Sequence, residues 1–276
     1  MVEEIAGGLT RDGATAGEVT MQEYMASLRY AGMIQNSLLP LPSLMNMLFS
    51  DYFVTYMPRD IVSGDFYYVY RGRNFFCVAA GDCTGHGVPG ALLSILGLGF
   101  LNEILQCQTA PRANRVLNQM REKMMSALHQ TGKLKETRDS IDMGLCIFSY
   151  TSNEMQFSSA NRPLFMVSDG ELREIRADRM PIGLAPLREE PFSNNMIRFS
   201  SSDMFYMFSD GFPDQFGGSD DKKYKYSRLR SLLTQVASHD ASKQKLMIEK
   251  EFLEWKGSTQ QVDDVMVFGF KPLIRK

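Results

Sequence analysis

The spacing of hydrophobic positions changes along the chain, and each spacing predicts a different kind of element. Over residues 21–39, apolar side chains recur every three or four positions, which predicts one amphipathic helix that Pro40 and Pro42 end. Aromatic and β-branched segments with a period of about two follow, and this period predicts strands. The predicted strands of this region cover residues 51–58, 65–72 and 74–82.

The remainder of the chain returns to helical and then to strand spacing. Helices are predicted over residues 88–106, 111–130, 227–237 and 241–255. Short strands are predicted between residues 140 and 211, and a last strand covers residues 264–270. Strands grouped around pairs of helices indicate an α+β layered fold. Residues 1–20 show no periodicity, and we interpret them as a flexible lead-in.

The composition argues against several classes of protein. The 276 residues carry a formal net charge of -2 and no basic stripe with interleaved aromatic residues, so nucleic-acid binding is not expected. The four cysteines are scattered without a C-x-x-C pair, which argues against a zinc site. No signal peptide opens the chain, and the longest apolar run, residues 88–101, contains Pro89 and several glycines and is too short to cross a bilayer. We therefore expect a cytoplasmic protein without membrane insertion.

Aspartates stand at the ends of several predicted strands. Asp65 opens one strand and Asp82 ends the next one, while Asp210 follows a long apolar run. Asp263 and Asp264 directly precede the last strand. Each aspartate alone is compatible with an ordinary turn or a helix cap. If the strand ends converge, however, like charges about 4 Å apart repel by roughly 4 kcal/mol per pair at an effective dielectric near 20, so the group needs a cation.

The chemistry of such a group follows from its donor atoms. All the expected ligands are oxygens, which suit Mg²⁺ or Mn²⁺ rather than zinc. Two such ions about 4 Å apart form a clamp for phosphoryl chemistry. The stretch after Asp82, with Gly85, His86 and Gly87 leading into an apolar helix, admits two interpretations. It is either a tight turn in which Asp82 caps the helix or part of a metal or phosphate site.

Motifs spread along the chain support a family resemblance. They are AGMIQNSLLP (31–40), PRDIVSGDFYYV (58–69), GDCTGHGVPGALLSILG (81–97), SSANRPLF (158–165), MPIGL (180–184), FSDGFPDQFGG (208–218) and QVDDVMVFGF (261–270). In this order they resemble the SpoIIE-type (stage II sporulation protein E family) bacterial serine/threonine phosphatases, a branch of the metal-dependent PPM superfamily. The match runs from about residue 22 to the C-terminus.

The resemblance implies an architecture and a domain organisation. It implies the PPM-type four-layer αββα sandwich, two antiparallel sheets flanked by helices, over residues 41–276. It also implies that residues 21–40 form a linker or regulatory helix between this output domain and an upstream sensor domain or protein. From its spacing alone, this helix either packs on its own domain or pairs with an upstream segment or with a second copy in a homodimer.

The resemblance also implies a site with two ions, Mn²⁺ or Mg²⁺. By motif, Asp82 bridges the ions. Of the Asp-Asp pair, Asp263 rather than Asp264 is the expected direct ligand. The implied catalytic and metal-binding residues are Asp65, Asp82, Cys83 through its carbonyl, Asp210 and Asp263. His86 is either a general acid or a residue that holds the turn. Arg59 and Arg162 are candidate phosphate contacts by their proximity to the motifs alone.

The implied activity is hydrolysis of phosphoserine or phosphothreonine on a bacterial signalling partner, for example an anti-sigma-factor antagonist, by metal-activated water. The sequence departs from the family pattern at Met266, where threonine is usual, and in SANRPL, where the pattern is GANNPL. Neither departure removes an implied ligand. The main alternative is a pseudo-phosphatase that binds a partner without turnover. SGDFY also resembles part of the diguanylate cyclase hairpin, but the glutamate of that motif is absent.

Overall fold

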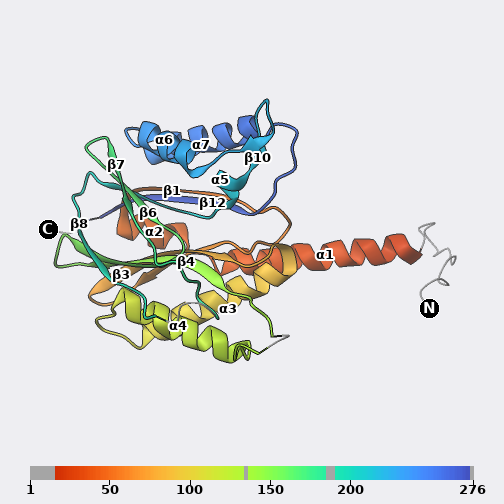
Figure 1. Ribbon diagram of the computed structural model, residues 1–276, viewed down its shortest axis with the longest axis horizontal. Helices are drawn as coiled ribbons and strands as arrows, with labels where there is room; N and C mark the ends of the chain where they lie inside the picture. Colours follow the sequence, from red (N-terminus) through yellow and green to blue (C-terminus); the bar gives the residue numbers. More distant parts are fainter. Residues whose placement is uncertain (1–15, 134–135, 185–189, 274–276) are drawn as a thin grey trace.

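Two antiparallel β-sheets stacked face to face form the centre of the molecule, and helices cover both outer faces (Figure 1). The computed structural model describes residues 16–133, 136–184 and 190–273. One sheet has the strand order β1-β12-β9-β6-β7, and the other has the order β2-β3-β4-β5-β8. Neighbouring strands in both sheets run antiparallel. This four-layer αββα arrangement confirms the fold class that the sequence predicts.

Strands and helices follow one another in the predicted order. The strands of the two main sheets are β1 (Phe49–Met57), β2 (Phe66–Arg71), β3 (Phe75–Cys83), β4 (Ile141–Ser149), β5 (Glu154–Ala160), β6 (Leu164–Ser168), β7 (Glu171–Ile175), β8 (Asn195–Arg198), β9 (Met204–Phe208) and β12 (Val265–Pro272). The helices are α1 (Ala16–Ser37), α2 (Pro42–Leu48), α3 (Gly87–Gln106), α4 (Ala113–Ala127), α5 (Gly211–Asp214), α6 (Tyr226–Val236) and α7 (Ala241–Lys256). A small hairpin, β10 (Phe216–Gly217) with β11 (Lys222–Lys223), lies between α5 and α6 in the chain.

Hydrophobic clusters hold the layers together. One lies between the two sheets and includes the stacked rings of Phe76 and Phe148, whose centroids are 4.6 Å apart. A second joins α3 and α4 to the sheet that contains β3, and a third joins α6 and α7 to the sheet that contains β9. Because both faces of each sheet are covered, central strands such as β9 are buried along their whole length. This explains why their sequences are continuous apolar runs without alternation.

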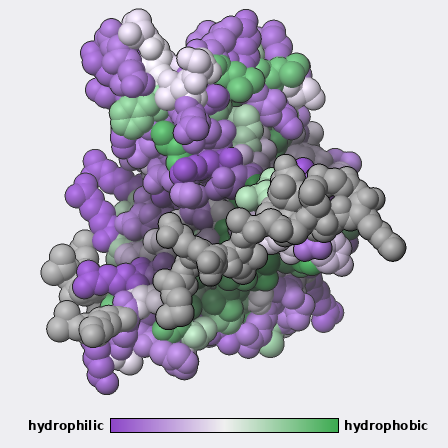
Figure 2. All heavy atoms as spheres, turned by 90° about the vertical axis from the view of Figure 1, so that its right-hand side faces the viewer, coloured by the Kyte–Doolittle hydropathy of each residue, from purple (hydrophilic) through white to green (hydrophobic). Residues whose placement is uncertain are grey.

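Helix α3 is a core helix that follows the glycine-rich turn. Leu98, Leu101 and Leu105 lie on its buried side, in the cluster that also contains α4. Among the described helices, α3 alone is long and apolar enough to cross a membrane by length and composition, and 50% of its apolar window is buried inside the domain. Figure 2 shows the side of the domain from which α1 projects, with hydrophobic surface in its lower part, at the level of α3 in Figure 1. The exposed large apolar side chains of α3 are Val88, Leu92 and Ile95.

The N-terminal helix differs from its prediction in length and in surroundings. Helix α1 begins at Ala16, so residues 16–20 are helical rather than part of a lead-in, and residues 1–15 lie outside the described part of the chain. The helix projects from the body of the domain (Figure 1), and Met21, Tyr24 and Leu38 of its predicted apolar face are exposed. The last part of the helix packs on its own domain, where Gly32 and Gln35 are buried, whereas the exposed apolar side chains near its start do not. Pairing with an upstream segment or a second copy stays a prediction.

The short helix α2 is an element that hydrophobic spacing does not predict. The prolines predict the end of the preceding helix, but Pro42 also begins α2, because proline is favoured in the first turn of a helix. Met45 and Leu48 anchor α2 in the cluster between the sheets. The helix therefore turns the chain from the end of α1 into β1.

Candidate active site

The predicted strand-end aspartates lie at one end of the sandwich and come from both sheets. Asp65 directly precedes β2 and Asp82 lies at the end of β3, in one sheet. Asp210 follows β9 and Asp264 directly precedes β12, in the other sheet. In an antiparallel pair, the start of one strand lies beside the end of its neighbour. Stacking of the sheets then brings the two pairs together, and the Asp210 amide lies 3.4 Å from Asp82 Oδ2.

The guanidinium of Arg162 lies at the centre of these carboxylates. Its Nη2 atom is 2.8 Å from Asp82 Oδ2, 2.7 Å from Asp210 Oδ2 and 3.4 Å from Asp142 Oδ2. The Arg162 side chain is only 10% exposed. Three carboxylates thus share one guanidinium, which leaves two negative charges uncompensated when all three are ionised. We call these three carboxylates and Asp65 the aspartate cluster.

Asp65 is the most buried carboxylate of the aspartate cluster. The residue is 2% exposed, and its Oδ2 atom has no hydrogen-bond partner among the residues that the structure describes. Burial raises the pKa of Asp65 well above its ordinary value of 3.8, and the negative charge of Asp82 raises it further. A buried polar atom without a partner destabilises the fold. The observation indicates a position built for a group that the chain does not supply.

The neighbouring carboxylates also carry raised pKa values. Asp82 and Asp142 face each other across β3 and β4. Burial raises the pKa of Asp82 to about 7, although the charge of Arg162 lowers it. Burial likewise raises the pKa of Asp142, again against Arg162, and the pKa of Asp263. One guanidinium is therefore too little positive charge for this end of the sandwich.

Asp264 binds main-chain groups rather than the aspartate cluster. Its Oδ1 accepts a hydrogen bond of 2.7 Å from the Arg59 amide, and its Oδ2 accepts one of 2.7 Å from the Gly64 amide. These bonds fix the segment that leads to Asp65. The neighbouring Asp263 is partly exposed, and its Oδ1 accepts a hydrogen bond of 2.9 Å from the Asp264 amide. The two members of the Asp-Asp motif therefore have different surroundings.

Close backbone packing explains the glycines after Asp82. Gly85 has a φ of +79°, in the left-handed region that favours glycine. A Cβ atom on Gly90 would lie 2.4 Å from the Gly85 carbonyl oxygen, and one on Gly64 would lie 2.8 Å from the same oxygen. The turn, the first residues of α3 and the loop before Asp65 therefore touch backbone to backbone, and this contact holds Asp65 close to the end of β3.

His86 occupies the rim of the site rather than the cluster itself. It is the N-cap residue of α3, without a side-chain cap bond, so the interpretation of Asp82 as the helix cap is wrong. The His86 Nδ1 atom lies 3.0 Å from Asp60 Oδ2, and both side chains are nearly half exposed, at 44% and 47%. Cys83 is buried, and burial raises the pKa of its thiol. This favours a structural thiol over a reactive one.

The donor atoms of the aspartate cluster fit a divalent cation. Within the described ranges, no three His, Cys, Asp or Glu side chains are already grouped so as to hold a metal ion, since Asp82 and Asp210 both turn to Arg162. The unpartnered Oδ2 of Asp65, the raised pKa values and the oxygen-only donors are nevertheless what a hard cation requires. The ligand set predicted from the sequence stays a prediction.

Asp142 is a residue of the site that none of the sequence motifs contains. It lies second in β4, directly opposite Asp82 in the antiparallel register. Asn161 also binds it, through a hydrogen bond of 2.8 Å from Nδ2 to Asp142 Oδ1. The signal is the same strand-end position that identifies the other aspartates, since Asp142 opens the apolar run IDMGLCIF. Arg162, by contrast, is a sequence candidate, and the structure places it against the cluster.

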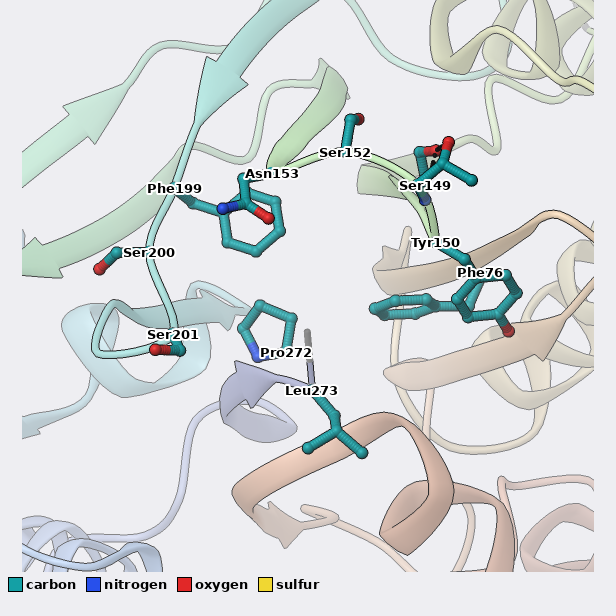
Figure 3. A pocket seen from close by; sticks show the side chains of 11 residues that line it. Phe76, Ser149, Tyr150, Ser152, Asn153, Phe199, Ser200, Ser201, Pro272 and Leu273 are labelled. Atoms are coloured by element: carbon teal, nitrogen blue, oxygen red, sulfur yellow. Dashed lines mark hydrogen bonds between the residues drawn. The ribbon is translucent and has the colours of Figure 1, made fainter. Parts of the chain in front are cut away.

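A cavity of about 880 Å³ lies at the other end of the sandwich (Figure 3). Its lining includes Phe76 at the start of β3, Tyr150 after β4 and Pro272 at the end of β12. From Phe76 to Asp82 the rise of a strand, about 3.3 Å per residue, gives a separation of about 20 Å. The cavity is therefore distinct from the aspartate cluster.

Comparisons with known proteins bear on this arrangement. A family model described as stage II sporulation protein E (SpoIIE) matches residues 73–272. No curated protein matches the chain. Among solved structures, the SiaA-PP2C domain of Pseudomonas aeruginosa is similar, with a TM-score of 0.82 and 27% identity over 91% of this chain and 98% of that chain.

Two more distant structures share the fold. One contains the PP2C phosphatase domain and a fragment of the regulatory domain of SpoIIE from Bacillus subtilis, with a TM-score of 0.65 and 17% identity over 83% of this chain and 65% of that chain. The other is the catalytic domain of the serine/threonine protein phosphatase PstP with two manganese ions, with a TM-score of 0.56 and 15% identity over 82% of this chain and 99% of that chain.

Proposed function

Because this chain belongs to the SpoIIE family of phosphatase domains, we propose that it removes phosphate from phosphoserine or phosphothreonine of a bacterial signalling protein in a metal-dependent reaction. The observation that carries the proposal is the aspartate cluster. Its carboxylates come from both sheets, and the pKa values of Asp65 and Asp82 are raised. The buried Oδ2 atom of Asp65 has no hydrogen-bond partner in the described part of the chain. The manganese ions of the PstP structure support a metal site in this fold.

The residues that would hold Mn²⁺ or Mg²⁺ are oxygen donors at the strand ends. We assign this role to Asp65, Asp82, the Cys83 carbonyl, Asp210 and Asp263. When bound, two such ions supply an activated water and neutralise the charge of the phosphate.

The chain itself supplies rigidity and position. The hydrogen bonds from Arg59 and Gly64 to Asp264 fix the loop before Asp65, so this carboxylate does not have to reorganise during the reaction. Pairing of β3 with β4 fixes Asp82 beside Asp142. Positioning and electrostatic stabilisation supply most of the rate enhancement in phosphoryl transfer, and both need fixed donors. His86 and Asp60 form an exposed pair at the rim, where a substrate protein can reach them.

The surroundings of α1 support a regulatory partner. The helix projects from the domain, and exposed apolar side chains such as Tyr30 and Met33 line it. We propose that an upstream sensor domain or a second copy of the chain covers these exposed side chains of α1. The B. subtilis structure, which contains a fragment of a regulatory domain, supports this role.

Hydrolysis of a chromogenic phosphomonoester tests the proposed activity. The purified chain should be inactive in excess chelator, and Mn²⁺ or Mg²⁺ in excess should restore turnover. A chain that binds a phosphoprotein but shows no metal-dependent turnover would instead be the pseudo-phosphatase. Full activity in excess chelator, without metal in the purified protein, would contradict the metal dependence.

A further inference from the structure

The side chain of Arg162 lies in a position that suits a cation. Its Nη2 atom donates a hydrogen bond of 2.7 Å to Asp210 Oδ2 and forms an ion pair of 2.8 Å with Asp82 Oδ2. The third carboxylate, Asp142, lies 3.4 Å away and interacts through charge. One guanidinium nitrogen thus contacts Asp82 and Asp210, two carboxylates that also belong to the proposed metal ligands.

From this geometry we infer that Arg162 is an internal counter-ion that competes with a divalent cation for Asp82 and Asp210. The inference rests on the metal site of the proposed function. The same two carboxylates would hold the ion, so the guanidinium and the ion would compete for them. Two positive charges so close would repel each other, and the repulsion is screened little where Arg162 and Asp82 lie, since their side chains are only 10% and 15% exposed. Metal binding therefore requires the guanidinium to leave both carboxylates.

The guanidinium is a poor substitute for a divalent ion. One positive charge faces three carboxylates, and the Arg162 Nε atom, although buried, has no hydrogen-bond partner within the described residues. Its Nη1 atom donates a long hydrogen bond of 3.4 Å to the Tyr226 hydroxyl. Arg162 therefore stabilises the metal-free protein without satisfying the cluster, and a divalent ion can displace it.

The main chain around Arg162 is held independently of its side chain. Arg162 follows β5, and the Ser159 hydroxyl donates a hydrogen bond to the Arg162 carbonyl oxygen. The Asn161 amide donates a hydrogen bond of 2.8 Å to the Asp178 carbonyl oxygen. Displacement of the guanidinium thus needs only side-chain rotation. The position is also a departure of this chain, since SANRPL has arginine where the family pattern GANNPL has asparagine.

Mn²⁺ affinity and metal-free stability test the inference without relying on turnover. Calorimetric titration with MnCl₂, and thermal unfolding in EDTA, should be compared between wild type and Arg162→Asn. We expect Arg162→Asn to bind Mn²⁺ at least about tenfold more tightly and to unfold at a lower temperature in EDTA, because the competing counter-ion is gone. Arg162→Lys keeps the positive charge but lacks the planar guanidinium, so its Mn²⁺ affinity and its unfolding temperature should lie between those of wild type and Arg162→Asn.

A matched control removes an arginine near the site without touching the cluster carboxylates. The Arg59 guanidinium donates to the Val262 carbonyl oxygen at 2.9 Å, so Arg59→Ala should change the Mn²⁺ affinity by less than about threefold. If Arg162→Asn does not fold, the comparison of Arg162→Lys with wild type decides. Mn²⁺ binding that is unchanged or weaker in the Arg162 variants would overturn the competition. Failure of every variant and of wild type to bind Mn²⁺ would overturn the metal site as well.

Discussion

The carboxylate of Asp264 accepts a hydrogen bond of 2.7 Å from the Gly64 amide and so joins the start of β12 to the loop before β2. The two strands belong to different sheets. The same carboxylate accepts the Arg59 amide, and Asp264 is only 3% exposed. The two adjacent aspartates therefore have different roles. Asp264 holds the loop before β2, and Asp263 lies beside the site.

This separation predicts different effects for the two aspartates. Asp264→Ala leaves two main-chain amides without their acceptor and should lower the free energy of unfolding by at least about 2 kcal/mol. Asp263→Ala, the matched control, should change it by less than about 1 kcal/mol in EDTA, because Asp263 is partly exposed and accepts a hydrogen bond from the adjacent amide. Urea unfolding in EDTA measures both. Equal losses for the two variants would contradict the distinction.

The raised pKa values predict how the stability of the metal-free protein depends on pH. The pKa of Asp82 is about 7 in the folded protein against an ordinary value of 3.8, and that of Asp65 is raised as well. Between about pH 4 and pH 7, the folded state therefore binds more protons than the unfolded state. The free energy of unfolding contributed by these groups should fall as pH rises through this window.

Urea unfolding in EDTA at several pH values tests this slope. Asp65→Asn removes one of the titrating groups, so the decrease between about pH 4 and pH 7 should become smaller. Asp220→Asn is the control, because Asp220 is exposed and pairs with Lys222 away from the cluster. The account is wrong if Asp65→Asn leaves the slope as it is in wild type.

The hydrogen bonds of Gln35 connect α1 to the site. Its amide is buried and binds the Ser63 carbonyl oxygen at 2.6 Å, the Ser63 amide at 3.0 Å and the Ser94 hydroxyl at 2.8 Å. One side chain of α1 therefore holds both α3 and the loop that carries Asp65. Gln35→Ala should lower the free energy of unfolding by about 1–3 kcal/mol and weaken Mn²⁺ binding.

A variant on the same helix serves as control for this link. Gln22 is exposed on α1, so Gln22→Ala should leave both the stability and the Mn²⁺ affinity close to those of wild type. Calorimetric Mn²⁺ titration of the two variants makes the comparison. Should Gln35→Ala lose stability but bind Mn²⁺ as wild type does, α1 would be a tether without influence on the site.

Sequence patterns predict the elements of this fold well where the period is strong, and they predict the site only in part. Apolar runs and turn signals identify β3, β9 and β12, because strands covered on both faces must be apolar throughout. The role of Asp264 could not be read from the sequence, since its acceptor bonds depend on how the two sheets stack. Spacing also does not reveal α2, because a helix of seven residues is too short to show a period.

The position of the Arg162 side chain is likewise a tertiary result. Its motif lies between β5 and β6, and the pairing of β3 with β4 and of β4 with β5, together with the stacking of the sheets, brings it against Asp82 and Asp210. The sequence supplies a departure from the family pattern at this residue. The sequence does not show which carboxylates this arginine contacts, because Asp82 and Asp210 lie far from it in the chain.

Phosphate release from a phosphothreonine peptide, with and without Mn²⁺, tests the central claim most directly. Wild type should release phosphate only with the metal, and Asp210→Asn should be at least about 10²-fold slower with its fold intact, because Asp210 is a proposed ligand. Asp214→Asn is the matched control, since Asp214 lies four residues further on, in α5, and pairs with Lys223. We expect it to keep a rate within about threefold of wild type. Metal-independent turnover, or Asp210→Asn at the wild-type rate, would contradict the assignment of the aspartate cluster as the catalytic centre.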